Sequence, residues 1–84
     1  MKFDDITAVV AAERARQQRL WNRQHAHGCG DCSSPDVPPM VKVAVLTEEC
    51  GEVARAALEC DQDALREELV QVAAVAYAIL EGIE

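Results

Sequence analysis

The sequence predicts an all-α fold, an antiparallel helical bundle with three helices in each chain. Three observations support this prediction. Apolar residues recur at helical spacing in three stretches, a run of turn formers separates the first two, and a short connector separates the last two. At 84 residues the chain is expected to form one small domain, for which a single core is marginal.

The first helix is expected over about residues 4–24, and either Asp4 or Asp5 can cap its amino-terminal end. Its inward positions follow helical spacing, whereas arginines mark the outer face. The inward positions are Ile6, Val9, Val10, Glu13, Gln17 and Leu20. The outer arginines are Arg14, Arg16, Arg19 and Arg23.

Residues 25–38 are predicted to form a loop, because this stretch is rich in Gly, Ser, Asp and Pro. Loops of this length are often functional. The segment contains four zinc-competent side chains, namely His25, His27, Cys29 and Cys32. A zinc-stabilised interaction domain is one interpretation, and a redox pair of the two cysteines is another. An unliganded loop beside the active site is preferred, because zinc sites usually draw their ligands from two separated clusters.

The second helix is expected over about residues 39–59, with Pro39 in its first turn. The third is expected over about residues 64–83, with Asp61 or Asp63 as its cap. Because so few residues connect these two helices, they should form an antiparallel hairpin.

The helix over residues 64–83 is apolar nearly all round, so it should be buried on every side. Two partner helices in the same chain cannot provide that burial, and an oligomer, most simply a two-fold homodimer, is therefore predicted. Its main stripe comprises Leu65, Leu69, Val72, Ala73, Ala76, Ile79 and Leu80. The main stripe of the second helix comprises Val43, Leu46, Cys50, Val53, Ala54 and Ala57. Cys50 is accordingly expected to be a buried small hydrophobe.

Composition excludes several classes of protein. The formal net charge of -7 at pH 7 argues against binding to a nucleic-acid polymer. The longest apolar run, over residues 69–80, is too short to span a membrane. The amino-terminal residues show no signal peptide, so a cytoplasmic protein with reduced thiols is expected.

The carboxylates Glu48, Glu49 and Glu52 project from one face of the second helix. Across the predicted hairpin, Glu68 and Gln71 of the third helix should face them. Three carboxylates and an amide oxygen make a plausible Mg²⁺ cage, whereas the simpler alternative is an acidic face in solvent. A glycine in mid-helix, Gly51, suggests the close approach of another backbone or a ligand.

These residues also carry a resemblance to a known family. The pattern Glu48-Glu49-x-x-Glu52 followed by Glu68-x-x-Gln71 resembles the motif of the MazG-like, all-α nucleoside triphosphate pyrophosphohydrolases. Residues 42–56 and 67–76 resemble the short, phage-type members, as do Arg16-Gln17 and Leu20-Trp21.

The resemblance implies a Mg²⁺-dependent hydrolase, with Mn²⁺ as a possible substitute, that cleaves an NTP or dNTP to the monophosphate and pyrophosphate. It also implies an obligate dimer or a dimer of dimers. By position, Glu49, Glu52 and Glu68 match the metal-binding carboxylates, and Glu48 matches a water-activating or outer residue. The family has Asp where this chain has Gln71, which removes one negative charge from the site.

Three functional hypotheses result. The first is the pyrophosphohydrolase, with Trp21 stacking on a nucleobase. Its candidate phosphate-binding residues are Arg16, Arg19, Arg23 and Lys42. The second is a catalytically weak or inactive helical module that binds a nucleotide or acts through its oligomeric surface, because of Gln71. The third is the zinc-stabilised interaction domain described above.

Overall fold

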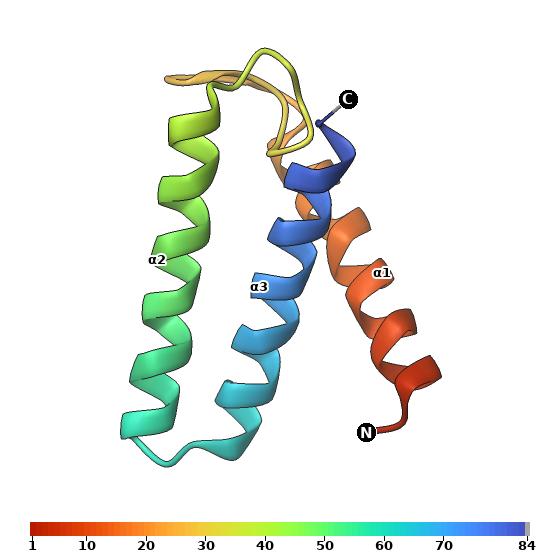
Figure 1. Ribbon diagram of the computed structural model, residues 1–84, viewed down its shortest axis with the longest axis vertical. Helices are drawn as coiled ribbons and strands as arrows, with labels where there is room; N and C mark the ends of the chain where they lie inside the picture. The colour runs from red at the N-terminus through yellow and green to blue at the C-terminus, as the bar shows by residue number, and fades with distance from the viewer. Residues whose placement is uncertain (84) are drawn as a thin grey trace.

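The computed structural model describes residues 1–83 and confirms the all-α fold class. Three helices, α1 (Phe3–Trp21), α2 (Pro39–Leu58) and α3 (Gln62–Glu81), lie side by side with α3 in the centre (Figure 1). α3 packs against both of the other helices. Two short strands, β1 (Gln24–His25) and β2 (Gly28–Cys29), lie between α1 and α2.

α1 begins one residue earlier and ends three residues earlier than the expected range of about 4–24. The prediction that Asp4 or Asp5 caps this helix is wrong. The cap position is Lys2, and both aspartates lie in the first turn. There their carboxylates complement the positive end of the helix dipole instead of accepting a capping hydrogen bond.

The α2–α3 hairpin is confirmed. Pro39 occupies the first turn of α2, where its missing N–H breaks no helical bond. Asp61 caps α3 by accepting a hydrogen bond of 3.0 Å from the backbone N–H of Ala64. Cys60 makes the turn with a left-handed φ of 55°. The two helices are therefore antiparallel, which places carboxylates of α2 opposite α3.

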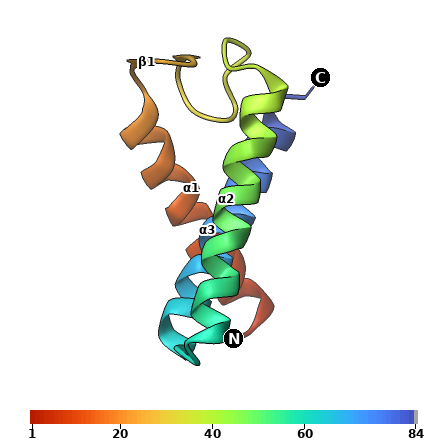
Figure 2. The same cartoon turned by 90° about the vertical axis from the view of Figure 1, so that its left-hand side faces the viewer.

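The connecting segment, residues 22–38, is more ordered than the predicted loop. Its strands β1 and β2 form an antiparallel pair, and the segment arches across the ends of the helices (Figures 1 and 2). Gly28 has a φ of +124°, and a Cβ there would lie 2.7 Å from the backbone oxygen of Asp36. Only glycine therefore fits this turn.

Arg14 is buried, contrary to the prediction that it lies on the outer face of the first helix. Its exposed fraction is 8%. The guanidinium donates to Asp31 at 2.6 Å and to Glu81 at 2.7 Å. Helical periodicity could not reveal this, because both partners come from distant segments. A buried arginine is tolerated when its N–H groups are paired with carboxylates.

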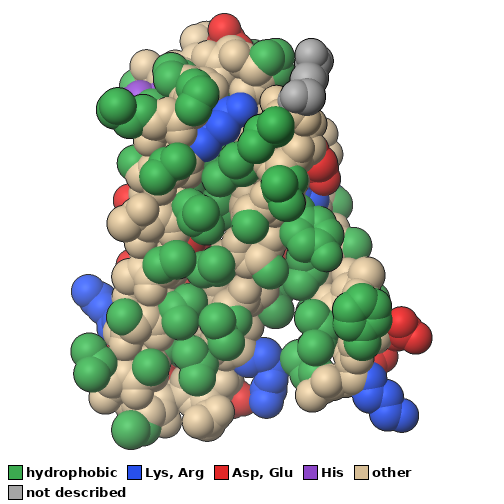
Figure 3. All heavy atoms as spheres, viewed as in Figure 1, with side chains coloured by type: hydrophobic (Ala, Val, Ile, Leu, Met, Phe, Trp, Pro, Cys, Tyr) green, Lys and Arg blue, Asp and Glu red, His purple; other side chains and the backbone are tan. Residues whose placement is uncertain are grey.

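The apolar stripes predicted for α2 and α3 point largely away from the core. The buried residues of α3 are Ala74, Val75 and Ala78, whereas Leu69 and Leu80 of the predicted main stripe are exposed. The predicted burial of Cys50 is likewise wrong, since this thiol is exposed. Figure 3 shows hydrophobic side chains gathered over the face that α2 and α3 share. The reason is that α3 is apolar all round but has only two neighbours.

We call this surface the outer apolar face. Its exposed or half-buried members are Val43, Cys50, Ala54, Ala57, Leu69, Ala73, Ala76, Tyr77 and Leu80. Within residues 1–83, no helix is long and apolar enough to cross a membrane.

Candidate functional site

A cavity of about 310 Å³ lies beneath the connecting segment, between the carboxyl-terminal half of α1 and the amino-terminal half of α2. Residues 71, 75 and 78 of α3 also line it. This loop-side cavity has an apolar part and a polar part. The apolar and aromatic lining is Leu20, Trp21, His25, His27, Val37, Val41, Val45, Val75 and Ala78. The polar lining includes Arg16, Gln17, Asp31, Glu48, Glu49 and Gln71.

Three of the predicted site residues, Glu49, Glu68 and Gln71, lie together across the hairpin. The amide nitrogen of Gln71 donates to Glu49 Oε2 at 3.1 Å and to Glu68 Oε2 at 3.3 Å, in the amide orientation that satisfies both carboxylates. Gln71 and Glu68 come from α3, and Glu49 comes from α2. The amide therefore lies between two carboxylates that would otherwise repel each other.

The electrostatics at Glu49 are unfavourable to its charged form. Burial raises the pKa of Glu49 above its ordinary value of 4.5, and the nearby charges of Glu68, Glu48, Glu52 and Glu13 raise it further. A carboxyl group with a raised pKa at the edge of a cavity is typical of functional sites. Negative charge at Glu49 is therefore only partly compensated by the surrounding side chains.

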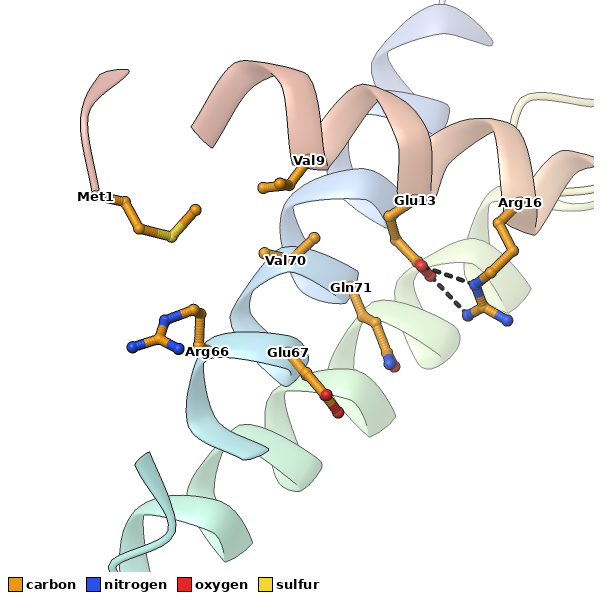
Figure 4. Close-up of a pocket in the computed structure, with 8 residues that line it drawn as sticks. All are labelled: Met1, Val9, Glu13, Arg16, Arg66, Glu67, Val70 and Gln71. Atoms are coloured by element: carbon orange, nitrogen blue, oxygen red, sulfur yellow. Dashed lines mark hydrogen bonds and ion pairs between the residues drawn. The ribbon is translucent and has the colours of Figure 1, made fainter. Parts of the chain in front are cut away.

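Two residues of α1 that were not predicted as site residues, Glu13 and Gln17, extend the acidic cluster. Glu13 forms a two-pronged ion pair with Arg16, with both distances at 2.7 Å (Figure 4). Gln17 donates to Glu13 at 3.0 Å and to the backbone oxygen of Gln71 at 3.4 Å. Their polar character at inward positions of the helix was the available signal, because such positions are normally apolar.

Of the other predicted site residues, some line the loop-side cavity and others do not. Glu48 and Trp21 line the loop-side cavity, and Glu52 is exposed but close enough to raise the pKa of Glu49. Arg19 is exposed and is not part of the cavity lining.

The candidate phosphate-binding role of Lys42 does not fit its position. Lys42 is buried, with an exposed fraction of 7%. A Cβ added at Gly82 would lie 3.1 Å from its Nζ atom, so the ammonium group reaches the carboxyl-terminal end of α3. There it complements the negative end of the helix dipole.

The histidine and cysteine segment is organised by hydrogen bonds. His25 Nδ1 accepts from the backbone N–H of His27 at 3.3 Å, which leaves Nε2 to donate to the backbone oxygen of Gly30 at 2.7 Å. His25 therefore has no ring nitrogen left for zinc in this arrangement. Burial raises the pKa of the Cys32 thiol, and the charge of Asp31 adds to the shift. A raised pKa disfavours the thiolate that zinc and redox chemistry require.

The chemistry of the acidic cluster suits a hard divalent cation. Carboxylate oxygens and an amide oxygen are ligands that Mg²⁺ and Mn²⁺ accept. Beside burial, four neighbouring carboxylates contribute to the raised pKa of Glu49, and a cation would offset their repulsion. Within residues 1–83, no group of three or more His, Cys, Asp or Glu side chains is arranged as a metal cage. Gln71 would have to rotate its amide to present oxygen to a cation.

A second cavity, of about 450 Å³, lies between the amino-terminal halves of α1 and α3. Figure 4 shows its lining, which includes Glu13, Arg16, Glu67 and Gln71. We call it the N-terminal cavity. Because Arg16 and Gln71 line both cavities, the two cavities are adjacent at these side chains.

Comparisons with protein-family models, with curated proteins and with solved structures found no match to this chain. The resemblance to MazG-like pyrophosphohydrolases therefore remains a prediction from the motif residues.

Proposed function

We propose that the chain is a divalent-cation-dependent nucleotide pyrophosphohydrolase, which hydrolyses a nucleoside triphosphate to the monophosphate and pyrophosphate. One observation carries this proposal. Glu49 and Glu68 converge on Gln71 from two facing helices, and Glu49 and Gln71 line a cavity that also contains an aromatic side chain. Glu48, Glu49 and Gln71 of the predicted motif therefore lie where a ligand can reach them.

The two parts of the loop-side cavity suggest how a nucleotide would lie. Trp21 contacts His25 edge-on, with ring centroids 5.6 Å apart, and these rings offer faces and edges to a nucleobase. The polyphosphate would lie toward Arg16, where the two cavities are adjacent. A cavity of about 310 Å³ is at the small end of ligand sites, so the phosphates would extend into the N-terminal cavity.

A polyphosphate cannot approach this cluster without positive charge. Four other carboxylates affect Glu49, whereas the nearby Arg16 is already paired with Glu13. Bound Mg²⁺ would supply the missing charge and would make the attacking water more acidic. Glu49, Glu52 and Glu68, with the amide oxygen of Gln71, are the residues that would hold it.

The remaining residues orient the substrate and move the proton. Glu48 lines the cavity and is exposed, which suits a carboxylate that accepts the proton of the attacking water. Arg16 uses Nε and Nη2 in its pair with Glu13, so its Nη1 group can still donate to a phosphate oxygen. Trp21 and His25 exclude water from one side of the bound base.

The proposal includes a homodimer or tetramer assembled through the outer apolar face. Exposed apolar surface on this scale is typical of protein–protein contacts, and Leu69, Tyr77 and Leu80 are each at least half exposed. The face lies on the side of α2 and α3 away from the carboxylates, so association would leave the loop-side cavity open.

The test is pyrophosphate release from a panel of canonical and modified nucleoside triphosphates, with Mg²⁺ and with EDTA. Glu49→Gln and Glu68→Gln should each reduce turnover on the order of 100-fold or more. Glu59→Gln is the matched control, because it removes one exposed carboxylate at the end of α2. Release that persists in EDTA, or in both site variants, would refute the proposal.

A second function, binding a nucleotide without turnover, is favoured by the position of Gln71. Its amide donates to both carboxylates and so offsets part of the repulsion that would attract a cation. Gln71→Asp restores the charge and separates the two functions. A large gain in hydrolysis from a nearly silent parent would support the binding function, whereas an active parent that changes little would support the enzyme.

A further inference from the structure

The buried guanidinium of Arg14 joins two segments that are far apart in the sequence. Its Nη1 group donates to Asp31 at 2.6 Å, and its Nε and Nη2 groups donate to Glu81 at 3.2 and 2.7 Å. Asp31 belongs to the connecting segment, and Glu81 is the last residue of α3. One side chain of α1 therefore ties the connecting segment to the carboxyl-terminal end of α3.

Asp31 is also the residue around which the segment turns. Its Oδ1 atom accepts from the backbone N–H of Ser33 at 3.0 Å and from the Ser33 hydroxyl at 2.6 Å. The side chains of Arg14 and Asp31 are only 9% and 8% exposed. Although burial acts to raise the pKa of Asp31, the hydrogen bonds of Ser33 and Arg14 outweigh it and lower the pKa. This ion pair is charged and well satisfied.

The remaining hydrogen bonds of the segment are largely internal. Cys29 donates its backbone N–H to Asp36 at 2.6 Å, and Gly30 donates to the backbone oxygen of Arg23 at 3.0 Å. Among residues 1–83, the contact between Asp31 and Arg14 is the one side-chain hydrogen bond from the segment to a helix. The burial of Val37, 4% exposed, is the main apolar contact at the other end.

The connecting segment supplies the outer wall of the loop-side cavity, through His25, His27, Gly30, Asp31 and Cys32. We propose that Arg14 is a positioning residue, which acts through Asp31 to hold residues 24–33 over the cavity as a fixed wall. The effect of Arg14 on nucleotide binding rests on the proposed function. Its effect on the order of residues 24–33 does not.

Hydrogen exchange of the backbone amides tests this directly. In Arg14→Met and in Asp31→Asn, exchange at Cys29 and Gly30 should rise on the order of tenfold or more, because local opening becomes easier. Exchange in the α2–α3 hairpin should stay as it is, except in the last turn of α3, where Arg14 contacts Glu81. Arg14→Lys keeps one positive charge and should restore part of the protection. Arg66→Met is the matched control, since Arg66 forms only an exposed pair of 3.5 Å with Asp63.

Asp31→Asn is included in case Arg14→Met fails to fold. It removes the negative charge, but the asparagine oxygen can still accept the hydrogen bonds of Ser33. Two results would overturn the proposal. One is unchanged exchange at Cys29 and Gly30 in both variants. The other is a uniform rise across all helices, which would show that Arg14 only stabilises the fold.

The lone Trp21 provides an independent spectroscopic signal. It contacts His25, the first cavity residue of the segment, so loosening the segment should increase quenching of its fluorescence by acrylamide. If the chain hydrolyses nucleotides, KM should rise in Asp31→Asn by more than kcat falls. A protein without hydrolysis would refute the proposed function alone, because the exchange and quenching results do not depend on turnover.

Discussion

Replacing Leu80 by glutamate should disrupt the proposed oligomer. Leu80 lies on the outer apolar face and is 66% exposed in the single chain. Fully burying a leucine side chain stabilises by about 1.5–3 kcal/mol, so an interface that covers the exposed two-thirds would gain about 1–2 kcal/mol. The residue occurs twice in a two-fold dimer, which doubles the loss to about 2–4 kcal/mol.

That loss corresponds to a dissociation constant about 30- to 1,000-fold weaker, and the desolvation of the new carboxylate adds to it. Sedimentation equilibrium over a range of concentrations measures this change. Gln18→Glu adds the same charge at an exposed position of α1 and should leave association intact. A Leu80→Glu protein that associates as the parent does would refute the reasoning, as would a parent that is monomeric throughout.

Two further predictions concern stability. Glu49→Gln should raise the melting temperature at pH 7. Burial and neighbouring carboxylates raise the pKa of Glu49 above 4.5, so its ionised form destabilises the folded state at that pH. This destabilisation grows as the pH rises from the unfolded-state pKa to the raised folded-state pKa, so the rise in melting temperature should disappear below about pH 4.5. An equal rise in melting temperature at pH 3 and at pH 7 would contradict the charge argument. Gly51→Ala should stabilise the fold by about 0.5–1 kcal/mol in urea unfolding, because among the described residues nothing outside its chain neighbours and its own helix backbone comes within 4 Å of the added Cβ. The close approach of another backbone predicted from Gly51 is thus wrong within a single chain, whereas the approach of a ligand stays a prediction, and a destabilised alanine variant would point to a contact in the oligomer.

The elements of the fold were predictable because they depend on local chemistry. Pro39 and Asp61 are start signals that act through their own backbone neighbours, and both occupy the expected positions. That Glu68 and Gln71 of α3 lie opposite carboxylates of α2 was also predictable, because a short connector fixes which residues of an antiparallel hairpin come level. The contact observed across the hairpin is between Gln71 and Glu49, whereas counting from the turn predicts Glu52 level with Glu68.

The contacts that sequence reasoning missed join distant segments. Helical spacing placed Arg14 on the outer face, yet Asp31 and Glu81 bury it from outside its own helix. The same applies to Leu69 and Leu80, which belong to an apolar stripe but find no partner within the chain. Periodicity shows which residues share a face, whereas it does not show what covers that face.

Because α3 lies in the centre of the fold, it contributes residues to two different surfaces. Its inner side holds Gln71 at the cavity with Glu68 beside it, and its outer side carries Leu69, Tyr77 and Leu80. A rotation of this one helix by a single residue, about 100°, would move both surfaces at once. If a nucleotide binds at the inner side and shifts α3, self-association must change by the same free energy in return. Nucleotide binding and self-association would then both report the position of α3.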